Sequence, residues 1–158
     1  MTDTIRRATS DDIPDVTRLN IEVQALHASH DPDQFKPATA PADVAAFFSE
    51  VIGRPDNELG MLGSRGAALG YVWFEHQIKP ETPFMLPVSR LYIYHIAVSA
   101  AARRQGAGAR LMQWVEERAG ALGANTIALA CMPANEGAHR FYEGLGFVTE
   151  RLILHKRA

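Results

Sequence analysis

The chain has 158 residues, which is enough for one domain with a single substantial hydrophobic core. Its 16 Lys and Arg against 18 Asp and Glu give a net charge of −2, and no region has the basic density typical of nucleic-acid-binding proteins. No run approaches the ~20 apolar residues of a membrane span. The N-terminus lacks a basic and then apolar signal peptide, and a single cysteine cannot form an intramolecular disulfide. We therefore expect one cytoplasmic domain over residues 1–158, with neither a membrane nor a nucleic acid as partner.

The charges are unevenly distributed along the chain. Residues 1–55 carry five Lys and Arg against nine Asp and Glu, whereas residues 99–158 carry eight against five. A positive second half suits an anionic cofactor, and an acidic first half would attract a cationic amine. Solvated charge without any partner explains the acidic half equally well.

The first third of the chain predicts one short strand and two helices. The strand covers residues 5–8, and the first helix is capped by Ser10 or Asp11 and has Pro14 in its first turn. Three prolines make residues 31–41 an irregular loop. Asp43 then caps a second, shorter helix that ends near Val51.

The middle of the chain predicts three strands. Residues 60–64 and 67–77 form a hairpin around the turn Arg65-Gly66. A loop with three prolines covers residues 79–87. The alternating apolar run from Leu91 to Val98 predicts the third strand, which is followed by a helix that begins after Gly106.

Glycines and arginines meet at this strand-to-helix junction, in the run Arg103-Arg104-Gln105-Gly106-Ala107-Gly108-Ala109. The first N–H groups of a helix have no intrahelical acceptor, and they bind an anion where glycine lets the backbone approach it. A P-loop would need Gly-Lys-Ser/Thr after its second glycine, and a dinucleotide fingerprint would need glycine where Leu111 stands. Taken alone, the run is compatible with either a pyrophosphate-binding loop or an ordinary helix start.

A second pattern follows after one more strand. Thr126 to Cys131 is a nearly all-apolar run typical of a strand buried on both faces. Asn135 is a favourable N-cap for a helix that ends near Leu145. Four residues of this helix recur on one face: Ala138, Phe141, Tyr142 and Leu145. A last strand is predicted over residues 148–154.

Together the two patterns resemble the GNAT superfamily of acetyl-CoA-dependent N-acetyltransferases. Its signature is Gln/Arg-x-x-Gly-x-Gly/Ala after a central strand, and then Asn-x-x-Ala-x-x-x-Tyr-x-x-x-Gly-Phe after the next strand. Arg103, Gly106 and Gly108 match the first part of the signature. The second part is matched by Asn135, Ala138, Tyr142, Gly146 and Phe147.

The element order β-α-α-β-β-β-α-β-α-β predicts an α/β fold with one central mixed sheet flanked by helices. The resemblance implies a single-domain GNAT-like fold in which this sheet is mostly antiparallel. It also implies that the Leu91 and Thr126 strands separate and that the pantetheine arm of acetyl-CoA lies between them. The acceptor is expected to contact the residue 27–48 region and the residue 79–87 loop. Dimerisation is common in the superfamily, so a homodimer is compatible with the sequence, which does not decide the point.

The resemblance also assigns site residues. Backbone N–H groups of Ile96, Ala97 and Val98 are expected to polarise the thioester carbonyl, because oriented backbone donors need no reorganisation. Tyr142 is the expected general acid for the leaving thiolate, although a core aromatic is the other interpretation of this position. The remaining cofactor-binding residues are expected to be Arg103, Arg104, Gln105, Gly106, Ala107, Gly108, Ala109, Asn135, Ala138 and Phe141.

The general base is where this sequence departs from many relatives. They carry Glu or Asp near positions 94 and 95, where this chain has Tyr94 and His95. His95 is the base candidate because imidazole titrates near neutrality, and a structural histidine is the alternative. Glu75 on the preceding strand is the second candidate for the general base.

Two other chemistries are less favoured. Cys131 in an apolar strand is typical of an inert small hydrophobic residue rather than a nucleophile. His27 and His30 lack the spacing and additional ligands of a zinc site, so no metal is expected.

Two functions of different class follow from the sequence. The first is direct transfer of an acetyl group from acetyl-CoA to a primary amine of a small molecule, peptide or protein. The second is a non-catalytic acyl-CoA-binding or regulatory domain, which the missing carboxylate at positions 94 and 95 leaves open.

Overall fold

The computed structural model describes residues 4–158, so residues 1–3, the start of the N-terminus considered above for a signal peptide, lie outside the described part. The elements in order are β1 (Ile5–Arg7), the 3₁₀ turn η1 (Ser10–Asp12), α1 (Ile13–His30), α2 (Pro41–Gly53), β2 (Asn57–Ser64), β3 (Ala67–Lys79), β4 (Val88–Val98), the 3₁₀ turn η2 (Ala100–Ala102), α3 (Ala107–Leu122), β5 (Thr126–Leu129) and α4 (Glu136–Gly144).

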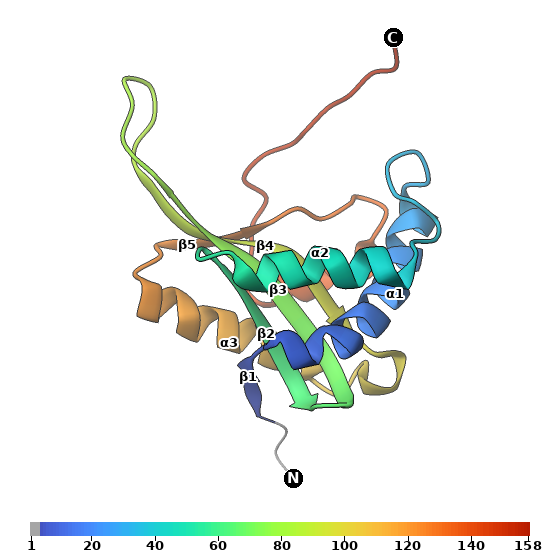
Figure 1. The fold of residues 1–158 in the computed structure, drawn as a ribbon. Coiled ribbons are helices and arrows are strands. Elements are labelled where there is room, and N and C mark those ends of the chain that lie inside the picture. The colour runs from blue at the N-terminus through green and yellow to red at the C-terminus, as the bar shows by residue number, and fades with distance from the viewer. Residues whose placement is uncertain (1–3) are drawn as a thin grey trace.

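The five strands form one sheet in the order β1-β2-β3-β4-β5. The first four pair antiparallel and β4 pairs parallel with β5, which confirms a mixed, mostly antiparallel sheet. Helices α1 and α2 cover one face, and α3 and α4 lie on the other (Figure 1). The long β3–β4 hairpin extends beyond the body of the molecule as a two-stranded arm (Figure 1).

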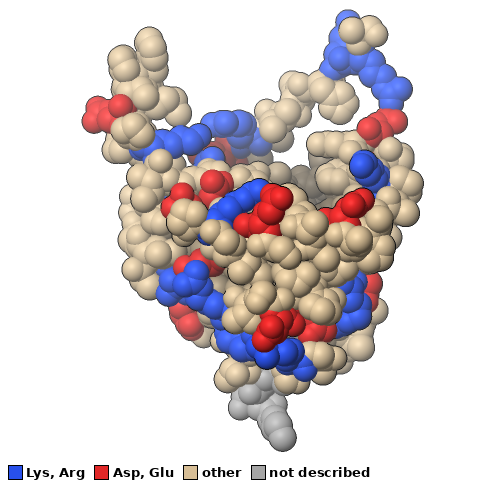
Figure 2. All heavy atoms as spheres, viewed as in Figure 1, with Lys and Arg blue, Asp and Glu red and all other residues tan. Residues whose placement is uncertain are grey.

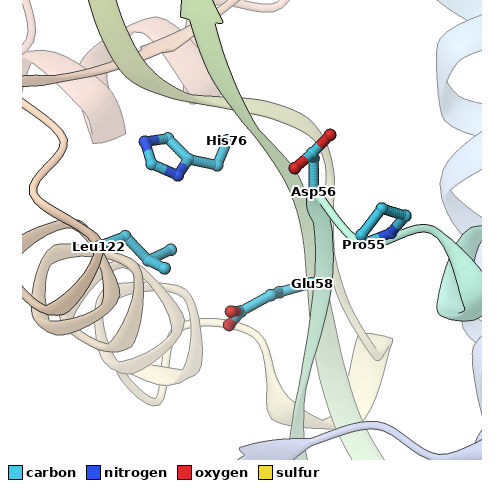
Figure 3. A pocket seen from close by; sticks show the side chains of 5 residues that line it. All are labelled: Pro55, Asp56, Glu58, His76 and Leu122. Carbon is cyan, nitrogen blue, oxygen red and sulfur yellow. The ribbon is translucent and has the colours of Figure 1, made fainter.

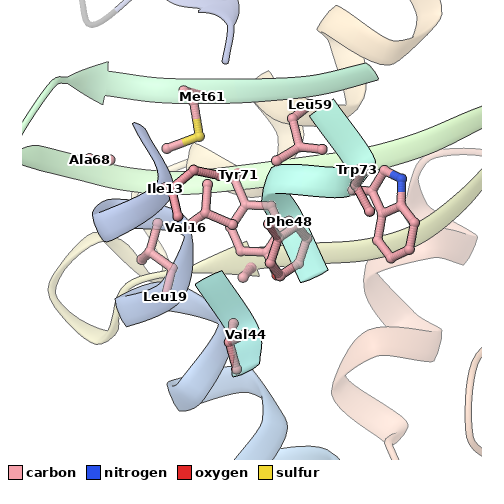
Figure 4. Close-up of a cluster of buried hydrophobic side chains, with 12 residues drawn as sticks. Ile13, Val16, Leu19, Val44, Phe48, Leu59, Met61, Ala68, Tyr71 and Trp73 are labelled. Atoms are coloured by element: carbon pink, nitrogen blue, oxygen red, sulfur yellow. The ribbon is translucent and has the colours of Figure 1, made fainter. Parts of the chain in front are cut away.

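Each face of the sheet has its own hydrophobic core. Under α1 and α2, Phe48 is 1% exposed and its ring lies 5.7 Å from that of Tyr71, which is fully buried (Figure 4). Under α3, the fully buried side chains are Leu111, Met112 and Val115. Phe141 and Tyr142 of α4 pack against this second core without being fully buried.

A buried ion pair holds the start of α1 against β1. The Asp12 side chain is fully buried and accepts two hydrogen bonds from the Arg6 guanidinium, at 2.7 and 2.6 Å. The Thr9 N–H donates a third, at 2.8 Å. Hydrogen bonding from Arg6 is the main reason that the pKa of Asp12 is lowered from 3.8 to about 2.

Asp12→Asn is expected to lower the free energy of unfolding by about 2 kcal/mol at pH 7, because it removes charge-assisted hydrogen bonds from a buried site. Since the folded-state pKa is lowered, the stabilisation is complete above the unfolded value near 3.8 and disappears as pH falls through about 2. Urea unfolding of both proteins between pH 2 and 7 measures this difference.

The adjacent Asp11 supplies the control for that measurement. Its side chain is 66% exposed and pairs with Arg65 at 3.1 Å. Asp11→Asn is expected to cost less than about 0.5 kcal/mol, because exposed ion pairs contribute little. Equal losses for the two variants would show that burial of the Asp12 carboxylate is not the cause.

Several predicted boundaries and environments differ from the structure. Helix α2 begins at Pro41 with Ala40 as its N-cap, so Asp43 lies in the first turn instead of capping the helix. Strand β5 ends at Leu129 and is only half-buried, because it is an edge strand and one of its edges has no neighbour among the described strands.

The predicted last strand is absent from the described structure. Residues 148–154 have no regular secondary structure. Val148, Leu152, Ile153 and Leu154 are 77–91% exposed. A strand forms only where a neighbouring strand accepts its backbone hydrogen bonds, and no described strand pairs with this segment. The order predicted from the sequence therefore holds as far as α4.

Candidate functional site

Strands β4 and β5 separate partway along their length. Their pairing ends at Ile93 and Leu129, while β4 continues to Val98. The N–H of Ser99 donates to the Leu69 carbonyl of β3 at 2.8 Å. Because successive residues of a strand point to opposite edges, the backbone groups of Val98 and Ile96 point away from β3, toward the gap. The N–H of Ala97 points toward β3 by the same alternation.

The loop after β4 leads into α3 through two residues with a positive φ angle. Arg104 has φ +61° and Gly106 has φ +79°, both in the left-handed region. Gly106 is the N-cap of α3, and the first intrahelical bond runs from the Arg110 N–H to the Gly106 carbonyl at 3.0 Å. The N–H groups of residues 107–109 therefore have no intrahelical acceptor and lie at the positive end of the helix dipole.

The polar side chains of this loop differ in their contacts. Arg103 Nε donates to the Val98 carbonyl at 3.3 Å, which fixes the loop to the end of β4. Gln105 Nε2 donates to the Ala101 carbonyl at 2.8 Å. Arg104 is exposed and makes no ion pair within residues 4–158. Its charge is therefore available to a ligand at the start of α3.

The two glycines of the loop have different physical roles. The position of a Gly106 side chain is open space, so its positive φ is what requires glycine. A Cβ on Gly108 would lie 3.1 Å from Cζ of Phe141. Gly108 thus lets α4 pack against the first turn of α3, a reason that differs from the expected approach of a phosphate.

Helix α4 begins as predicted. The Asn135 side chain caps it by accepting a hydrogen bond from the Ala138 N–H at 3.1 Å. Tyr142 is half-buried between Phe141 and Phe147, with ring centroids at 5.1 and 5.6 Å. Burial, followed by the nearby Cys131, raises the pKa of the Tyr142 phenol above its usual range. The phenol is therefore protonated at neutral pH.

A bulge places two polar rings on the α1 and α2 face of the sheet. Trp73 pairs with His95 and Phe74 with Ile93, so Tyr94 is the extra residue in β4. Without the bulge, Tyr94 and His95 would point to opposite faces. Instead both contact Trp73, with ring centroids at 4.6 Å for Tyr94 and 5.1 Å for His95.

His95 belongs to a buried polar network that the sequence analysis did not identify. Its Nδ1 lies 3.2 Å from Asn20 Nδ2 and 3.2 Å from the Tyr71 hydroxyl, and Asn20 also donates to Tyr71 at 2.9 Å. A proton on Nδ1 would be donated to the Tyr71 oxygen, whereas a lone pair on Nδ1 would accept from Asn20 Nδ2 or from the Tyr71 O–H. Both tautomers of His95 therefore find a hydrogen-bond partner at Nδ1.

A second histidine contributes to the electrostatics of this network. Burial is the main reason that the pKa of His95 is lowered to about 4, and His27 of α1 adds to it. The two rings lie 6.5 Å apart. Phe35, from the loop between α1 and α2, covers His27 at 5.2 Å. His95 is consequently neutral across the physiological pH range.

Glu75 and Tyr94 form a second polar pair beside this network. The Tyr94 hydroxyl donates to Glu75 Oε2 at 2.6 Å, and Gln77 Nε2 donates to the same oxygen at 3.0 Å. The bond from Tyr94 is the main reason that the pKa of Glu75 is lowered. The carboxylate is ionised at neutral pH and holds a proton weakly.

A signal for one of the missed residues is present in the sequence. Asn20 lies four residues after Val16 and seven after Ile13, on the buried face of α1. A polar residue on an apolar helix face needs a buried hydrogen-bond partner, so the position of Asn20 indicated such a partner. Tyr71 lies in an apolar strand and carries no comparable signal.

Cys131 has the surroundings of a structural thiol. It is half-buried, and burial raises its pKa. Its Sγ lies 3.8 Å from the Met132 carbonyl oxygen. Within residues 4–158, no group of three or more His, Cys, Asp or Glu side chains could hold a metal ion. In the same range no helix is long and apolar enough to cross a membrane.

A pocket of about 150 Å³ lies away from the gap between β4 and β5. Its lining side chains come from the start of β2, from β3 and from the end of α3: Pro55, Asp56, Glu58, His76 and Leu122 (Figure 3). Glu58 already accepts two hydrogen bonds from Arg118, at 2.8 and 2.9 Å. His76 is bonded to Ser89 at 3.2 Å. These polar groups are engaged within the protein, so we do not assign the reaction to this pocket.

Comparison with known proteins gives the same fold. The BH1408 protein from Bacillus halodurans, in a tetramutant form, is 23% identical with a TM-score of 0.88, over 98% of this chain and 99% of that one. A transcriptional regulator from Bacillus halodurans C-125 is 26% identical with a TM-score of 0.76, over 98% of this chain and 99% of that one. A possible acetyltransferase from Clostridium difficile 630 is 12% identical with a TM-score of 0.80, over 100% of this chain and 98% of that one.

No curated protein matches the sequence. The model of the acetyltransferase (GNAT) family matches residues 23–147, a range that includes both glycine-containing patterns and every strand from β2 to β5. The chain therefore belongs to the acetyltransferase (GNAT) family.

Proposed function

We propose that this protein transfers an acetyl group from acetyl-CoA directly to a primary amine, with both substrates bound at once. The observation that carries this proposal is the gap between β4 and β5 beside the N-terminus of α3. The pairing of β5 with β4 ends there, and the free N–H groups at the start of α3 would bind an anion. Tyr142 packs on the α3 and α4 face of the sheet, and the His95 ring packs on the α1 and α2 face.

The residues of the gap and loop fit the chemistry of acetyl-CoA. Its phosphates would accept hydrogen bonds from the N–H groups of residues 107–109 and from the two arginines, Arg103 and Arg104. Its pantetheine arm would lie along β4, beside Asn135, Ala138 and Phe141. Acetyl-CoA would supply an activated thioester as the acetyl source.

Backbone N–H groups of β4 would stabilise negative charge on the thioester oxygen. Ile96 and Val98 are the better donors among the three predicted residues, because their backbone groups point toward the gap. Ala97 would contribute by holding β4 in register with β3, since its N–H points toward that strand. Such donors are effective because they are already oriented.

We assign proton transfer to two side chains. Tyr142 would donate a proton to the departing thiolate, because its raised pKa keeps the phenol protonated. His95 would take the proton that the amine loses. For this its Nδ1 must carry a proton and donate to Tyr71, which leaves the lone pair on Nε2. The lowered pKa keeps the imidazole unprotonated at neutral pH.

Steady-state acetyl transfer to a panel of amines, followed by the release of free thiol, tests this function. Direct transfer requires intersecting initial-rate plots, and Cys131→Ala should retain most of the activity. Parallel plots with acetyl-enzyme on Cys131 would replace direct transfer by a covalent mechanism. Tight acetyl-CoA binding without any turnover would favour a regulatory role, which is the description that one structural neighbour carries.

Gly106→Ala is expected to raise the dissociation constant of acetyl-CoA at least about tenfold, or about 1.4 kcal/mol. The reason is that an L side chain disfavours φ +79°, so the loop would rotate its N–H groups away from the phosphates. Calorimetric titration of acetyl-CoA into the folded variant measures the effect.

Gly123 provides a matched control at the other end of α3. It has φ +69° and open space around it, as Gly106 does. Gly123→Ala should cost a similar amount of stability, about 1 kcal/mol, and leave acetyl-CoA affinity unchanged. If both variants bind acetyl-CoA as the wild type does, the phosphates do not bind at this loop.

A further inference from the structure

A second pocket, of about 230 Å³, lies beside Trp73, whose ring contacts His95 on another side. It is lined by the C-cap residue of α2, the start of β2 and the aromatic part of β3 and β4: Arg54, Asn57, Trp73, Glu75 and Tyr94. The Trp73 ring separates this pocket from the His95 ring. The centroids of the Trp73 and His95 rings lie 5.1 Å apart. Ligand sites of drug size occupy roughly 300–1,000 Å³, so this pocket suits a smaller molecule.

Glu75, on one side of the pocket, has a carboxylate oxygen without a partner among the described residues. Both donors to Glu75, Tyr94 and Gln77, bond to Oε2. Oε1 has no hydrogen-bond partner within residues 4–158. Because two donors fix the orientation of the group, Oε1 is a preorganised acceptor for an amine or ammonium.

The other wall presents donors. Arg54 is 46% exposed, and its nearest carboxylate is Glu50 at 3.9 Å, a long and exposed contact that stabilises little. Asn57 uses Oδ1 to accept from Trp73 Nε1 at 2.7 Å, and its Nδ2 makes no hydrogen bond in the described structure. Arg54 and Glu75 line the same pocket without forming an ion pair, although Arg54 is near enough to help lower the pKa of Glu75.

The two walls therefore carry opposite charge across a small space. Charges of both signs are also interspersed on the molecular face shown in Figure 2, rather than gathered into one basic or acidic patch. A diamine would place its second positive charge against Arg54, and a dianion would meet Glu75; each would leave one wall unsatisfied. A molecule with an amine and a carboxylate satisfies both walls.

We propose that this pocket binds the amine acceptor and that the acceptor is a free α-amino acid. Its amine would bind Glu75 Oε1, its carboxylate would bind Arg54 and Asn57, and its side chain would lie along the exposed part of Tyr94. The stacked pair of Trp73 and Tyr94 forms the apolar floor. This inference rests on the proposed acetyl transfer and names its substrate class.

The test compares acceptors that differ only in the carboxylate. The twenty standard α-amino acids are assayed singly with acetyl-CoA, and the most active one is compared with its carboxamide. Wild-type protein should prefer the amino acid by at least about tenfold in kcat/KM, because the amide cannot form the charged contact to Arg54. Arg54→Gln should reduce this preference to less than about threefold, mainly through KM of the amino acid.

Glu50→Gln is the matched control, because it removes the carboxylate nearest to Arg54 without touching the pocket lining. This variant should keep the wild-type preference or increase it. Equal activity toward amino acid and amide in wild-type protein would overturn the proposal. So would an unchanged preference in a folded Arg54→Gln protein.

Binding measurements separate this inference from acetyl transfer itself. Calorimetric titration of the same amino acid and amide into protein saturated with CoA does not depend on turnover. Arg54-dependent binding of the amino acid without any transfer would support the pocket and reject the proposed reaction. Transfer to simple amines, with no amino acid bound or used, would support the reaction and reject the pocket.

Discussion

Replacing Tyr142 by phenylalanine is expected to lower kcat about a hundredfold. The change keeps the ring and its contacts with Phe141 and Phe147 but removes the proton donor. General acid catalysis contributes typically ~10²–10⁴-fold, and the lower end applies because a thiolate leaves without full protonation. Single-turnover mixing measures the chemical step even where product release limits kcat. Stability and acetyl-CoA affinity should barely change.

Phe147→Leu separates proton donation from packing. It alters the ring that lies 5.6 Å from Tyr142 but leaves the phenol in place. If the two variants lose activity equally, the loss reflects the position of α4 and not the acid. Wild-type single-turnover rates in Tyr142→Phe would show that the motif tyrosine is a packing residue.

Local patterns in the sequence were sufficient to predict the framework of the site. The N-cap of Asn135 and the common face of Phe141 and Tyr142 follow from helix periodicity, and the structure confirms both. The start of a helix after Gly106 was predicted as well, and α3 begins at Ala107. These features depend on residues that are close in the chain, which is why sequence patterns reveal them.

Features that depend on contacts between distant segments were not predictable in the same way. Gly108 was interpreted through its expected ligand, whereas its neighbour in the structure is Phe141, 33 positions further along the chain. The interaction of Asn20 with His95 joins α1 to β4. The bulge at Tyr94 depends on the register between β3 and β4. No local periodicity encodes any of these.

The prediction of a last strand was wrong for the same physical reason. Residues 148–154 have the composition of a strand, but composition gives only a tendency, and a strand also needs a neighbour to accept its hydrogen bonds. Strand β5, the outermost of the sheet, pairs over only four residues. An apolar segment can therefore remain irregular and exposed.

The bulge links the fold to the proposed chemistry. By turning Tyr94 and His95 to the same face, it places both rings against Trp73, which lies between the pocket of Glu75 and the imidazole. The same strand presents Ile96 and Val98 to the gap a few residues further on. One irregularity in β4 would therefore align the acceptor site, the base and the carbonyl donors.

His95→Gln is expected to lower kcat about a hundredfold, because glutamine remains polar but cannot accept a proton. In wild-type protein, the ionisation of His95 should leave log kcat/KM flat between about pH 5.5 and 7.5. The reason is that His95 loses its proton as pH rises through about 4, so its basic form already dominates above that value. Activity should fall only as pH approaches 4, and no inflection should occur near the ordinary histidine value of about 6.5.

Nitrogen-15 NMR of His95 provides the structural half of this prediction. If His95 is the base, the neutral ring carries its proton on Nδ1, donated to Tyr71, and Tyr71→Phe should shift the ring toward the other tautomer and lower kcat. A proton found on Nε2 would make His95 a hydrogen-bond donor held by Asn20. In that case, or if His95→Gln turns over at the wild-type single-turnover rate, the base is elsewhere and Glu75 is the next residue to replace.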